Sequence, residues 1–319
     1  MKELKILGIV AAFTLLLYWG VEPFAHSQMH KHVDSNSFVY SGKADIQEAE
    51  ASKKPELLAK KKAFWSDVEK ISKLEGNVQA GETAFATCLG CHTGMPINMG
   101  GVIPPKLDHA GSLYDKNYLI ALIKDPAMAS NVDHKYADTA THPMGSIKAM
   151  MADDQQIADV VAYILANKAG ELTNKEAFEE ACERCHAMRY AHTTQLGDTP
   201  KFKYKKDELA HKIKVIEEQD RVKAYMGKLP PDLSMIIRAR SEHFLETFVE
   251  NPQGQLPGTS MPRVGLTHEG YEKVKTYLEK IGDPSKEARE ELGPKVILFF
   301  VFFSILAFFW KKAKWKDHH

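Results

Sequence analysis

Two copies of one short motif contain every cysteine of this 319-residue chain. They are "CLGCH", which starts at Cys88, and "CERCH", which starts at Cys182, so each has the spacing Cys-x-x-Cys-His. A redox-active dithiol needs only one such pair, usually in a strand-rich fold, and no strand-rich pattern surrounds either site. Four thiolates together can hold one zinc ion, but the two histidines would then have no role. Zinc and disulfide bonds are therefore the weaker interpretations.

Covalent haem attachment gives a role to every position of the motif. Each cysteine adds to a vinyl group of the haem, the two-residue spacer sets their separation, and the histidine lies beneath the iron as its proximal ligand. The sequence therefore predicts two covalently bound haem c groups. The predicted attachment residues and proximal ligands are Cys88, Cys91 and His92 for the first haem, and Cys182, Cys185 and His186 for the second.

Two apolar runs flank the region that holds these motifs. Residues 6–21 follow two lysines, and residues 296–310 precede a tail with four more. As helices, the runs would span about 22–24 Å, and flanking lysines can extend toward the interfaces to cover a core of about 30 Å. The positive-inside rule places both termini in the cytoplasm, so the haem motifs would face the periplasm of a bacterium. We therefore predict an N-terminal anchor at residues 1–25 and a C-terminal anchor with a basic tail at residues 284–319.

The N-terminal run has a second interpretation, a cleaved signal peptide. Its basic start and apolar centre fit either one. The following "VEPFAHS" offers only an imperfect small-x-small cleavage site, at Ala25 and Ser27, which favours a retained anchor.

Composition limits what the remaining chain can be. The net charge is zero and 44% of the residues are hydrophobic, so no basic field indicates nucleic-acid binding. Between the anchors the length suits two domains. We place a helical or linker region at residues 26–75, a first unit at residues 76–170 and a second unit at residues 171–283.

The two units follow the same order of features. Each has a short helical segment that leads into the haem motif, then a Pro-Pro pair, a methionine-bearing loop and an amphipathic closing helix. Apolar residues recur with helical spacing in both closing helices. They are Ile157, Val160, Val161 and Ile164 in the first, and Tyr271, Val274, Leu278 and Ile281 in the second. The predicted fold class is all-α, with two class I cytochrome c-type haem domains in tandem between the two transmembrane helices.

The repeat is unequal between the haem histidine and the Pro-Pro pair. Pro104 follows His92 by 12 positions, whereas Pro230 follows His186 by 44. The extra residues include "KFKYKKDELAHKIK". We interpret them as a solvated, charged surface insertion, with a docking surface as the alternative.

A methionine on the distal side of each haem would favour reduced iron and leave no open position for oxygen or peroxide. Met261, in "GTSMPRVGL", is the predicted distal ligand of the second haem, and Met144, in "THPMGSI", that of the first. The alternatives to Met144 are Met95, Met128, Met150 and Met151, and less favoured are His109, His134 and His142. The residues expected to border the haems are Pro104, Pro105, Pro230, Pro231 and Leu233.

From Cys182 onward the chain resembles cytochrome c1, the haem subunit of the cytochrome bc1 complex. The similar segments are "CERCHAMRY", "LPPDLSMIIRAR", "MPRVGL" and "DPSKEAREELGPKVILFF", in this order and over about 140 residues. Residues 76–168 resemble only a generic cytochrome c domain. A second haem and an N-terminal anchor depart from the usual subunit with one haem and resemble a dihaem variety found in some bacteria.

The resemblance implies a role in a respiratory chain. Such a subunit accepts electrons from the Rieske iron–sulfur protein beside cytochrome b, and it passes them to a periplasmic cytochrome c or to a terminal oxidase such as a cbb3-type enzyme. It has no active site of its own, and the complex is expected to be a dimer in the bacterial cytoplasmic membrane. The resemblance places the Rieske contact on the second unit, so the first unit would deliver electrons onward. Residues 76–168 hold six Lys or Arg and nine Asp or Glu. This negative net charge would attract a basic electron acceptor, or it is too small to have a functional effect.

Three other functions remain open at this point. A dihaem subunit of a cbb3-type oxidase would also be anchored, but its anchor is expected before the haems and not after them. A dihaem cytochrome c peroxidase would need an open distal position on one haem, against which the two methionine loops argue. A soluble dihaem shuttle is excluded if either anchor is retained.

Overall fold

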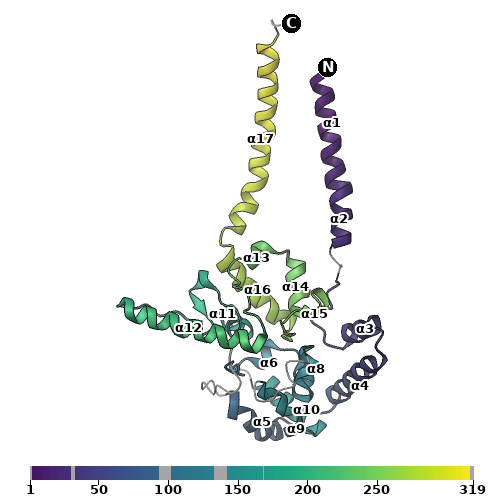
Figure 1. Cartoon of the computed structure of the whole chain (residues 1–319), viewed down its shortest axis with the longest axis vertical. Coiled ribbons are helices and arrows are strands. Elements are labelled where there is room, and N and C mark those ends of the chain that lie inside the picture. Colours follow the sequence, from purple (N-terminus) through teal and green to yellow (C-terminus); the bar gives the residue numbers. More distant parts are fainter. Residues whose placement is uncertain (1, 30–32, 93–101, 133–141, 168, 317–319) are drawn as a thin grey trace.

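The computed structural model describes residues 2–29, 33–92, 102–132, 142–167 and 169–316. Two long helices stand on one side of a helical body (Figure 1). The first is formed by α1 (Lys2–Leu16), a π-helical turn η1 (Leu17–Val21) and α2 (Glu22–Met29), and the second is α17 (Lys286–Lys314). Lys2–Ala25 and Lys286–Lys314 are long and apolar enough to cross a membrane, and none of their most apolar stretch is buried within the chain.

The free ends of the two long helices lie together. The Lys311 ammonium is 2.6 Å from the Glu3 carboxylate, and the outer ends of α1 and α17 lie near each other in Figure 1. Both ends of the chain are therefore on the same side of the two helices. Pro294 lies inside α17, where it removes one backbone hydrogen bond at the start of the apolar run.

The segment between the first anchor and the first unit is an ordered arm. We call residues 33–72 the N-terminal arm. It contains α3 (Lys43–Ala51) and α4 (Pro55–Ser72), and α4 packs against two helices of the first unit, α7 (Lys116–Lys124) and α10 (Asp154–Ala166). The buried side of α4 carries Phe64, Trp65, Val68 and Ile71, which join the main hydrophobic core. The region predicted only as helical or linker thus covers the first unit.

The first unit is organised around the crossing of its opening and closing helices. These are α5 (Val78–His92) and α10, and they make the most extensive helix–helix contact of the described chain. A Cβ atom on Gly81 would lie 2.0 Å from the Asp159 carbonyl oxygen, so glycine allows this close approach. Between them lie α6 (Ala110–Leu113), α7, α8 (Pro126–Ser130), the 3₁₀ helix η3 (Pro143–Ser146) and α9 (Ile147–Met150).

The second unit repeats this plan. Its opening helix is α11 (Asn174–Phe178) followed by the π-helical turn η4 (Glu179–Glu183), and α11 packs against the closing helix α16 (His268–Gly282). A capping box of Thr173 and Glu176 begins α11. The remaining elements are the 3₁₀ helix η5 (Arg189–Ala191), the strands β1 (Thr193–Thr194) and β2 (Gly197–Asp198), α12 (Lys205–Met226), α13 (Ile236–Ala239), α14 (Glu242–Glu250) and α15 (Pro252–Gln255).

The predicted closing helices are confirmed. Ile157, Val160, Val161 and Ile164 are all buried on α10, and Tyr271, Val274 and Leu278 are buried on α16. The described chain is mostly helical, and its only sheet is the antiparallel pair of β1 and β2. Helix α10 ends at Ala166, and Gly282 is the last residue of α16.

One hydrophobic core runs through both units. Leu113 and Tyr118 from the first unit and Leu266 and Tyr271 from the second belong to the same buried cluster. Tyr114 and Leu266 form a backbone bridge, and the Asp115 amide donates to the Gly265 carbonyl oxygen at 3.0 Å. The predicted boundary near residue 170 therefore separates two repeats of sequence that share one core.

The insertion between His186 and Pro230 is mainly a single helix, α12. Only Glu218, Val222 and Met226 are buried along its 22 residues, and the helix projects from the body in Figure 1. The expected solvated, charged surface is therefore helical.

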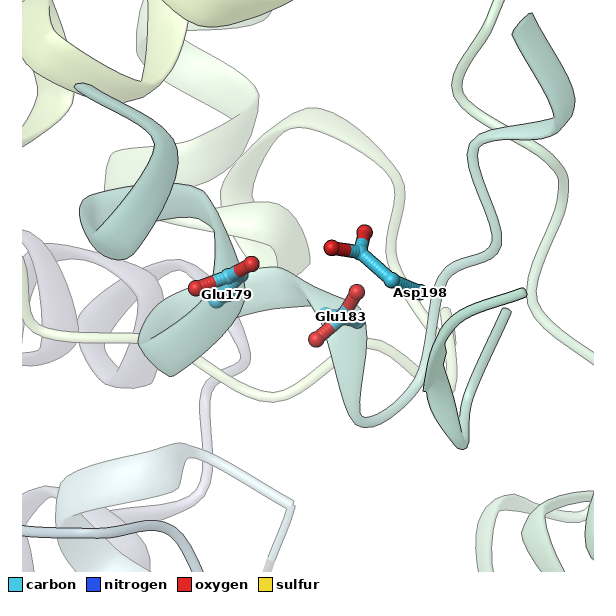
Figure 2. Close-up of side chains that lie close together, drawn as sticks. All are labelled: Glu179, Glu183 and Asp198. Atoms are coloured by element: carbon cyan, nitrogen blue, oxygen red, sulfur yellow. The ribbon is translucent and has the colours of Figure 1, made fainter. Parts of the chain in front are cut away.

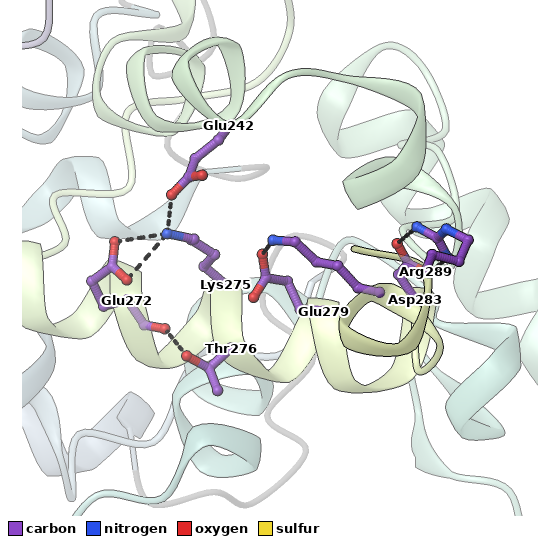
Figure 3. A network of polar contacts seen from close by, with 8 residues as sticks. Glu242, Glu272, Lys275, Thr276, Glu279, Asp283 and Arg289 are labelled. Carbon is purple, nitrogen blue, oxygen red and sulfur yellow. Dashed lines mark hydrogen bonds and ion pairs between the residues drawn. The ribbon is translucent and has the colours of Figure 1, made fainter. Parts of the chain in front are cut away.

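The closing helix α16 is joined to the long apolar helix α17 by ion pairs (Figure 3). The Lys286 ammonium is 2.7 Å from the Glu279 carboxylate, and the Arg289 guanidinium contacts both oxygens of Asp283 at 2.5 and 2.7 Å. On the other side, Lys275 bridges Glu272 of its own helix and Glu242 of α14. These contacts fix how the second unit connects to its anchor.

Candidate haem sites

The first Cys-x-x-Cys-His motif lies at the end of α5. Cys88 and Cys91 are free and half-buried, and Cys88 packs against the main core. Residues three apart on a helix lie on the same face, so both thiols are directed to the same side. Burial raises the pKa of the Cys88 thiol. The structure thus offers two unpaired thiols at the spacing that haem attachment needs.

His92 is held by the carbonyl group of Pro105. The distance from His92 Nδ1 to the Pro105 oxygen is 2.8 Å. Since a carbonyl oxygen only accepts, Nδ1 carries the hydrogen, and Nε2 keeps its lone pair for a metal. Burial lowers the pKa of His92, which favours the neutral imidazole that binds iron.

The second motif has the same arrangement. The carbonyl oxygen of Cys182 accepts from the amides of Cys185 and His186, at 3.1 and 2.9 Å, which closes the motif into a tight turn. His186 Nδ1 lies 2.8 Å from the Pro231 carbonyl oxygen. Burial lowers the pKa of His186 and raises that of the Cys182 thiol to about 12. The Leu233 amide donates to the Ala187 carbonyl oxygen at 2.9 Å, which fixes the Pro-Pro segment beside the motif.

These contacts give the Pro-Pro pairs a role that the sequence indicated only in outline. The second proline of each pair orients the histidine, although the two spacings differ by 32 positions (44 against 12). The repetition of Pro-Pro after each motif indicated that the prolines border the haems. It did not indicate that the histidine Nδ1 would be hydrogen-bonded to a proline carbonyl oxygen.

The described alternatives to Met144 lie in different surroundings. Met128 and Met151 are buried in the core, and Met150 is 56% exposed. His109 Nδ1 is 2.5 Å from the Glu180 carboxylate, and the His142 ring stacks on Tyr225. Met95 and His134 lie outside the described residues. Met144 itself is half-buried in η3 and packs against the core, and its role as a ligand stays a prediction.

Met261 is half-buried in the loop between α15 and α16. The Gln253 amide donates to the carbonyl oxygens of Thr259 and Met261, at 2.6 and 3.3 Å, so the loop is held from α15. Its assignment as the second distal ligand also stays a prediction.

The two candidate sites are neighbours. Arg184, inside the second motif, lies close enough to His92 to contribute to lowering its pKa, and its charge also acts on Cys182 and on buried Tyr114. The Nε atom of Arg184 is buried and has no hydrogen-bond partner among the residues that the structure describes. The His109–Glu180 pair links α6 of the first unit to η4 of the second. Neither contact could be predicted from the sequence, because each joins residues of different units.

Three carboxylates form an acidic cluster at η4 (Figure 2). Glu179, Glu183 and Asp198 place their carboxylate oxygens within 4.8 Å of one another. The Lys175 ammonium is 3.0 Å from Glu179 and 2.7 Å from Asp198, so it compensates much of the negative charge. Burial, together with the charge of Glu179, raises the pKa of Glu183 to about 7. The cluster is a partly exposed ion-pair network beside the second motif.

The donor set fits haem c. Each motif supplies two unpaired thiols and a histidine whose Nδ1 is already hydrogen-bonded, which leaves Nε2 as the metal-binding atom. A structural zinc site would use the thiolates as ligands and leave these oriented imidazoles without a function.

Comparisons with known proteins agree with this chemistry. Residues 78–168 match the family model of cytochrome c. Cytochrome c1 of Allochromatium vinosum is 24% identical over 217 residues, which cover 49% of this chain and 87% of that protein. A chain of a hyperthermophilic respiratory Complex III has a TM-score of 0.35 and 24% identity, and the match covers 45% of this chain and 74% of that one. Residues 78–168 therefore form a cytochrome c domain, which implies covalently bound haem c, and about half of the chain is homologous to a cytochrome c1.

Proposed function

We propose that this chain is the dihaem cytochrome c1-type subunit of a bacterial cytochrome bc1 complex. It accepts electrons from the Rieske iron–sulfur protein and passes them to a periplasmic cytochrome c or a terminal oxidase. The cytochrome c1 homologue and the cytochrome c domain at residues 78–168 support the electron-transfer role. The repeated haem motif supports the number of two.

One observation carries the proposal of two equivalent haem sites. Both histidines have Nδ1 at 2.8 Å from the carbonyl oxygen of the second proline of a Pro-Pro pair. This contact fixes the tautomer and the ring orientation and raises the basicity of the ligand nitrogen. Two units with different loop lengths thus share one way of preparing an imidazole for iron.

The side chains have separate tasks in each site. When bound, haem c supplies a one-electron couple between ferric and ferrous iron. Cys88 and Cys91 hold the first haem and Cys182 and Cys185 the second. The histidines ligate on the proximal side. Met144 and Met261 would each offer a thioether to the iron, and such a ligand would favour the reduced state and leave no open position for oxygen.

The anchors support a bacterial membrane topology with both termini in the cytoplasm. The Glu3–Lys311 pair joins the free ends of the two long helices, and lysines follow the apolar run of α17. The helical body is then periplasmic, where haem c is attached. Cytochrome b and the Rieske protein are the expected partners in a dimeric complex. The second unit would receive electrons and the first would deliver them.

Purification of the tagged chain from membranes tests the function. We expect cytochrome b and the Rieske protein to co-purify with it in fixed proportion, and quinol to reduce its haems. Co-purification with the catalytic subunit of a cbb3-type oxidase, or peroxidase activity with a high-spin haem, would refute the proposal in favour of one of the alternatives.

A further inference from the structure

The loop that carries Met261 has no regular secondary structure from Met261 to Gly265. Its shape therefore depends on side-chain contacts and on backbone hydrogen bonds to other segments. The inference below rests on the proposed function, in which Met261 is the distal ligand of the second haem. It concerns the residues that hold this loop.

Arg263, two positions after Met261, is the anchor of the loop. Its side chain is 4% exposed, and its guanidinium donates to Asp45 at 2.5 and 3.2 Å and to the Asn251 side-chain oxygen at 3.0 Å. The backbone is fixed as well, since the Arg263 amide donates to the Ser130 carbonyl oxygen at 3.1 Å and its own carbonyl oxygen accepts from the Tyr118 hydroxyl at 2.7 Å. Arg263 thus contacts the N-terminal arm and both units.

Asp45 is held in place by its own surroundings. Its side chain is 1% exposed, and the Trp65 indole donates to it at 2.9 Å. The Trp65 ring lies on Gly42, where a Cβ atom would come within 2.0 Å of the ring and the backbone has a positive φ of 74°. Helices α3 and α4 therefore present a carboxylate of fixed position to the loop.

A second contact binds the arm to the same part of the second unit. The Glu250 carboxylate accepts the backbone amides of Asn36 and Phe38, each at 2.9 Å. Glu250 and Asn251 end the helix α14 and precede α15, whose Gln253 holds the carbonyl oxygen of Met261. The arm is thus attached on both sides of the methionine loop.

A buried ion pair contributes little net stability, because desolvation offsets much of the attraction between the charges. Its geometric effect is larger, since a two-point guanidinium–carboxylate contact fixes both orientation and distance. We propose that Asp45 is a positioning residue for the distal ligand: through Arg263, the N-terminal arm holds Met261 in place over the second haem.

The test compares variants of the full-length, haem-loaded protein. Asp45→Asn keeps the size of the side chain and removes its charge, and Glu48→Gln on the same helix, where the side chain is 44% exposed, is the matched control. We measure the near-infrared thioether absorbance of the ferric protein, the midpoint potential of each haem and carbon monoxide binding. We expect Asp45→Asn to lose the share of the thioether absorbance that belongs to the second haem, to lower the potential of that haem and to make it bind carbon monoxide. The first haem and the control should be unchanged.

Two further variants keep the result interpretable. Trp65→Phe removes the indole donor to Asp45 and leaves a smaller ring in its place, and it should shift the potential of the second haem in the same direction if Asp45→Asn does not accumulate. Met261→Leu must itself abolish the same absorbance; if it does not, the ligand assignment in the proposed function is wrong, whatever Asp45→Asn shows. If Met261→Leu abolishes it but both arm variants keep the native spectrum and potentials and only lower the melting temperature, the positioning role is overturned.

Discussion

At the scale of single residues, two imidazoles are prepared for iron by the backbone that surrounds them. Pro105 and Pro231 contribute carbonyl oxygens that hold Nδ1–H, and burial keeps both rings neutral by lowering their pKa. The cysteines and histidines could be predicted from the motif alone, because covalent attachment fixes their order along the chain. The tautomer-fixing contacts could not, because they depend on how distant loops return to each motif.

Replacement of the distal ligands tests the ligation directly. Met261→Leu should remove the thioether band of the second haem and lower its potential, because the ligand that favours ferrous iron is lost. Met144→Leu should do the same for the first haem, so each variant is the control for the other in near-infrared and redox titrations. A wild-type haem that is high-spin and binds carbon monoxide readily would contradict the assignment for its unit.

The raised pKa of Glu183 predicts how the stability of the fold depends on pH. Its pKa in the folded chain is about 7, above the ordinary value of 4.5, so the folded state favours the protonated carboxyl. The contribution of protonated Glu183 to the free energy of unfolding is therefore complete below the pKa of the unfolded chain, and it is lost as the pH rises through about 7. Glu183→Gln should flatten the decline in melting temperature between about pH 5 and about pH 8. Glu171→Gln, at an exposed position, is the control, and an unchanged slope in Glu183→Gln would refute the interpretation.

At the scale of secondary-structure elements, each unit depends on one helix crossing. The apolar periodicity of α10 and α16 predicted these helices, because a helix that covers a core must repeat every three to four residues. The crossing partner of α10 was not predicted, and neither were the π-helical turn η4 nor the length of α12. The reason is that these features depend on tertiary contacts such as the close approach of Gly81 to Asp159.

That close approach gives a matched pair of substitutions on α5. Gly81→Ala should destabilise the protein by about 1–3 kcal/mol, because the added methyl group meets the backbone of α10 and the helices must separate. Glu82→Ala, at the next position of the same helix, changes an exposed side chain and should alter the free energy of unfolding by no more than about 0.5 kcal/mol. Thermal unfolding monitored by circular dichroism and haem absorbance measures both. Equal melting temperatures for the two variants would contradict the described crossing.

At the scale of the whole molecule, the arm, the two units and the two anchors form a connected structure. The sequence predicted two anchors and two units from apolar runs and repeated motifs, and it treated residues 26–75 as a connection. It could not predict the Asp45–Arg263 contact, because those residues are 218 positions apart and nothing local to either one indicates the other. The shared core could not be predicted for the same reason, because it joins residues that are distant in the sequence.

The anchors can be removed without cutting the core. Behind a cleavable export signal, a chain of residues 28–281 keeps the arm and both units, so it should be soluble in the periplasm and carry two haems, as measured by fractionation and haem content. A shorter chain of residues 76–170 lacks Leu266 and Tyr271 of the shared core and should fold poorly. Tight membrane binding of residues 28–281 in the absence of partner subunits would show that the attachment lies elsewhere.

The most direct test of the central claim is the path of electrons in a complex without the first haem. Cys88→Ala with Cys91→Ala removes that haem, and the spectrum of the second haem shows whether its unit is intact. In stopped-flow measurements with quinol, we predict nearly native reduction of the second haem and slow delivery to the acceptor, most clearly at low salt. If the intact second haem is no longer reduced by quinol, electrons arrive through the first unit, and the proposed direction is wrong.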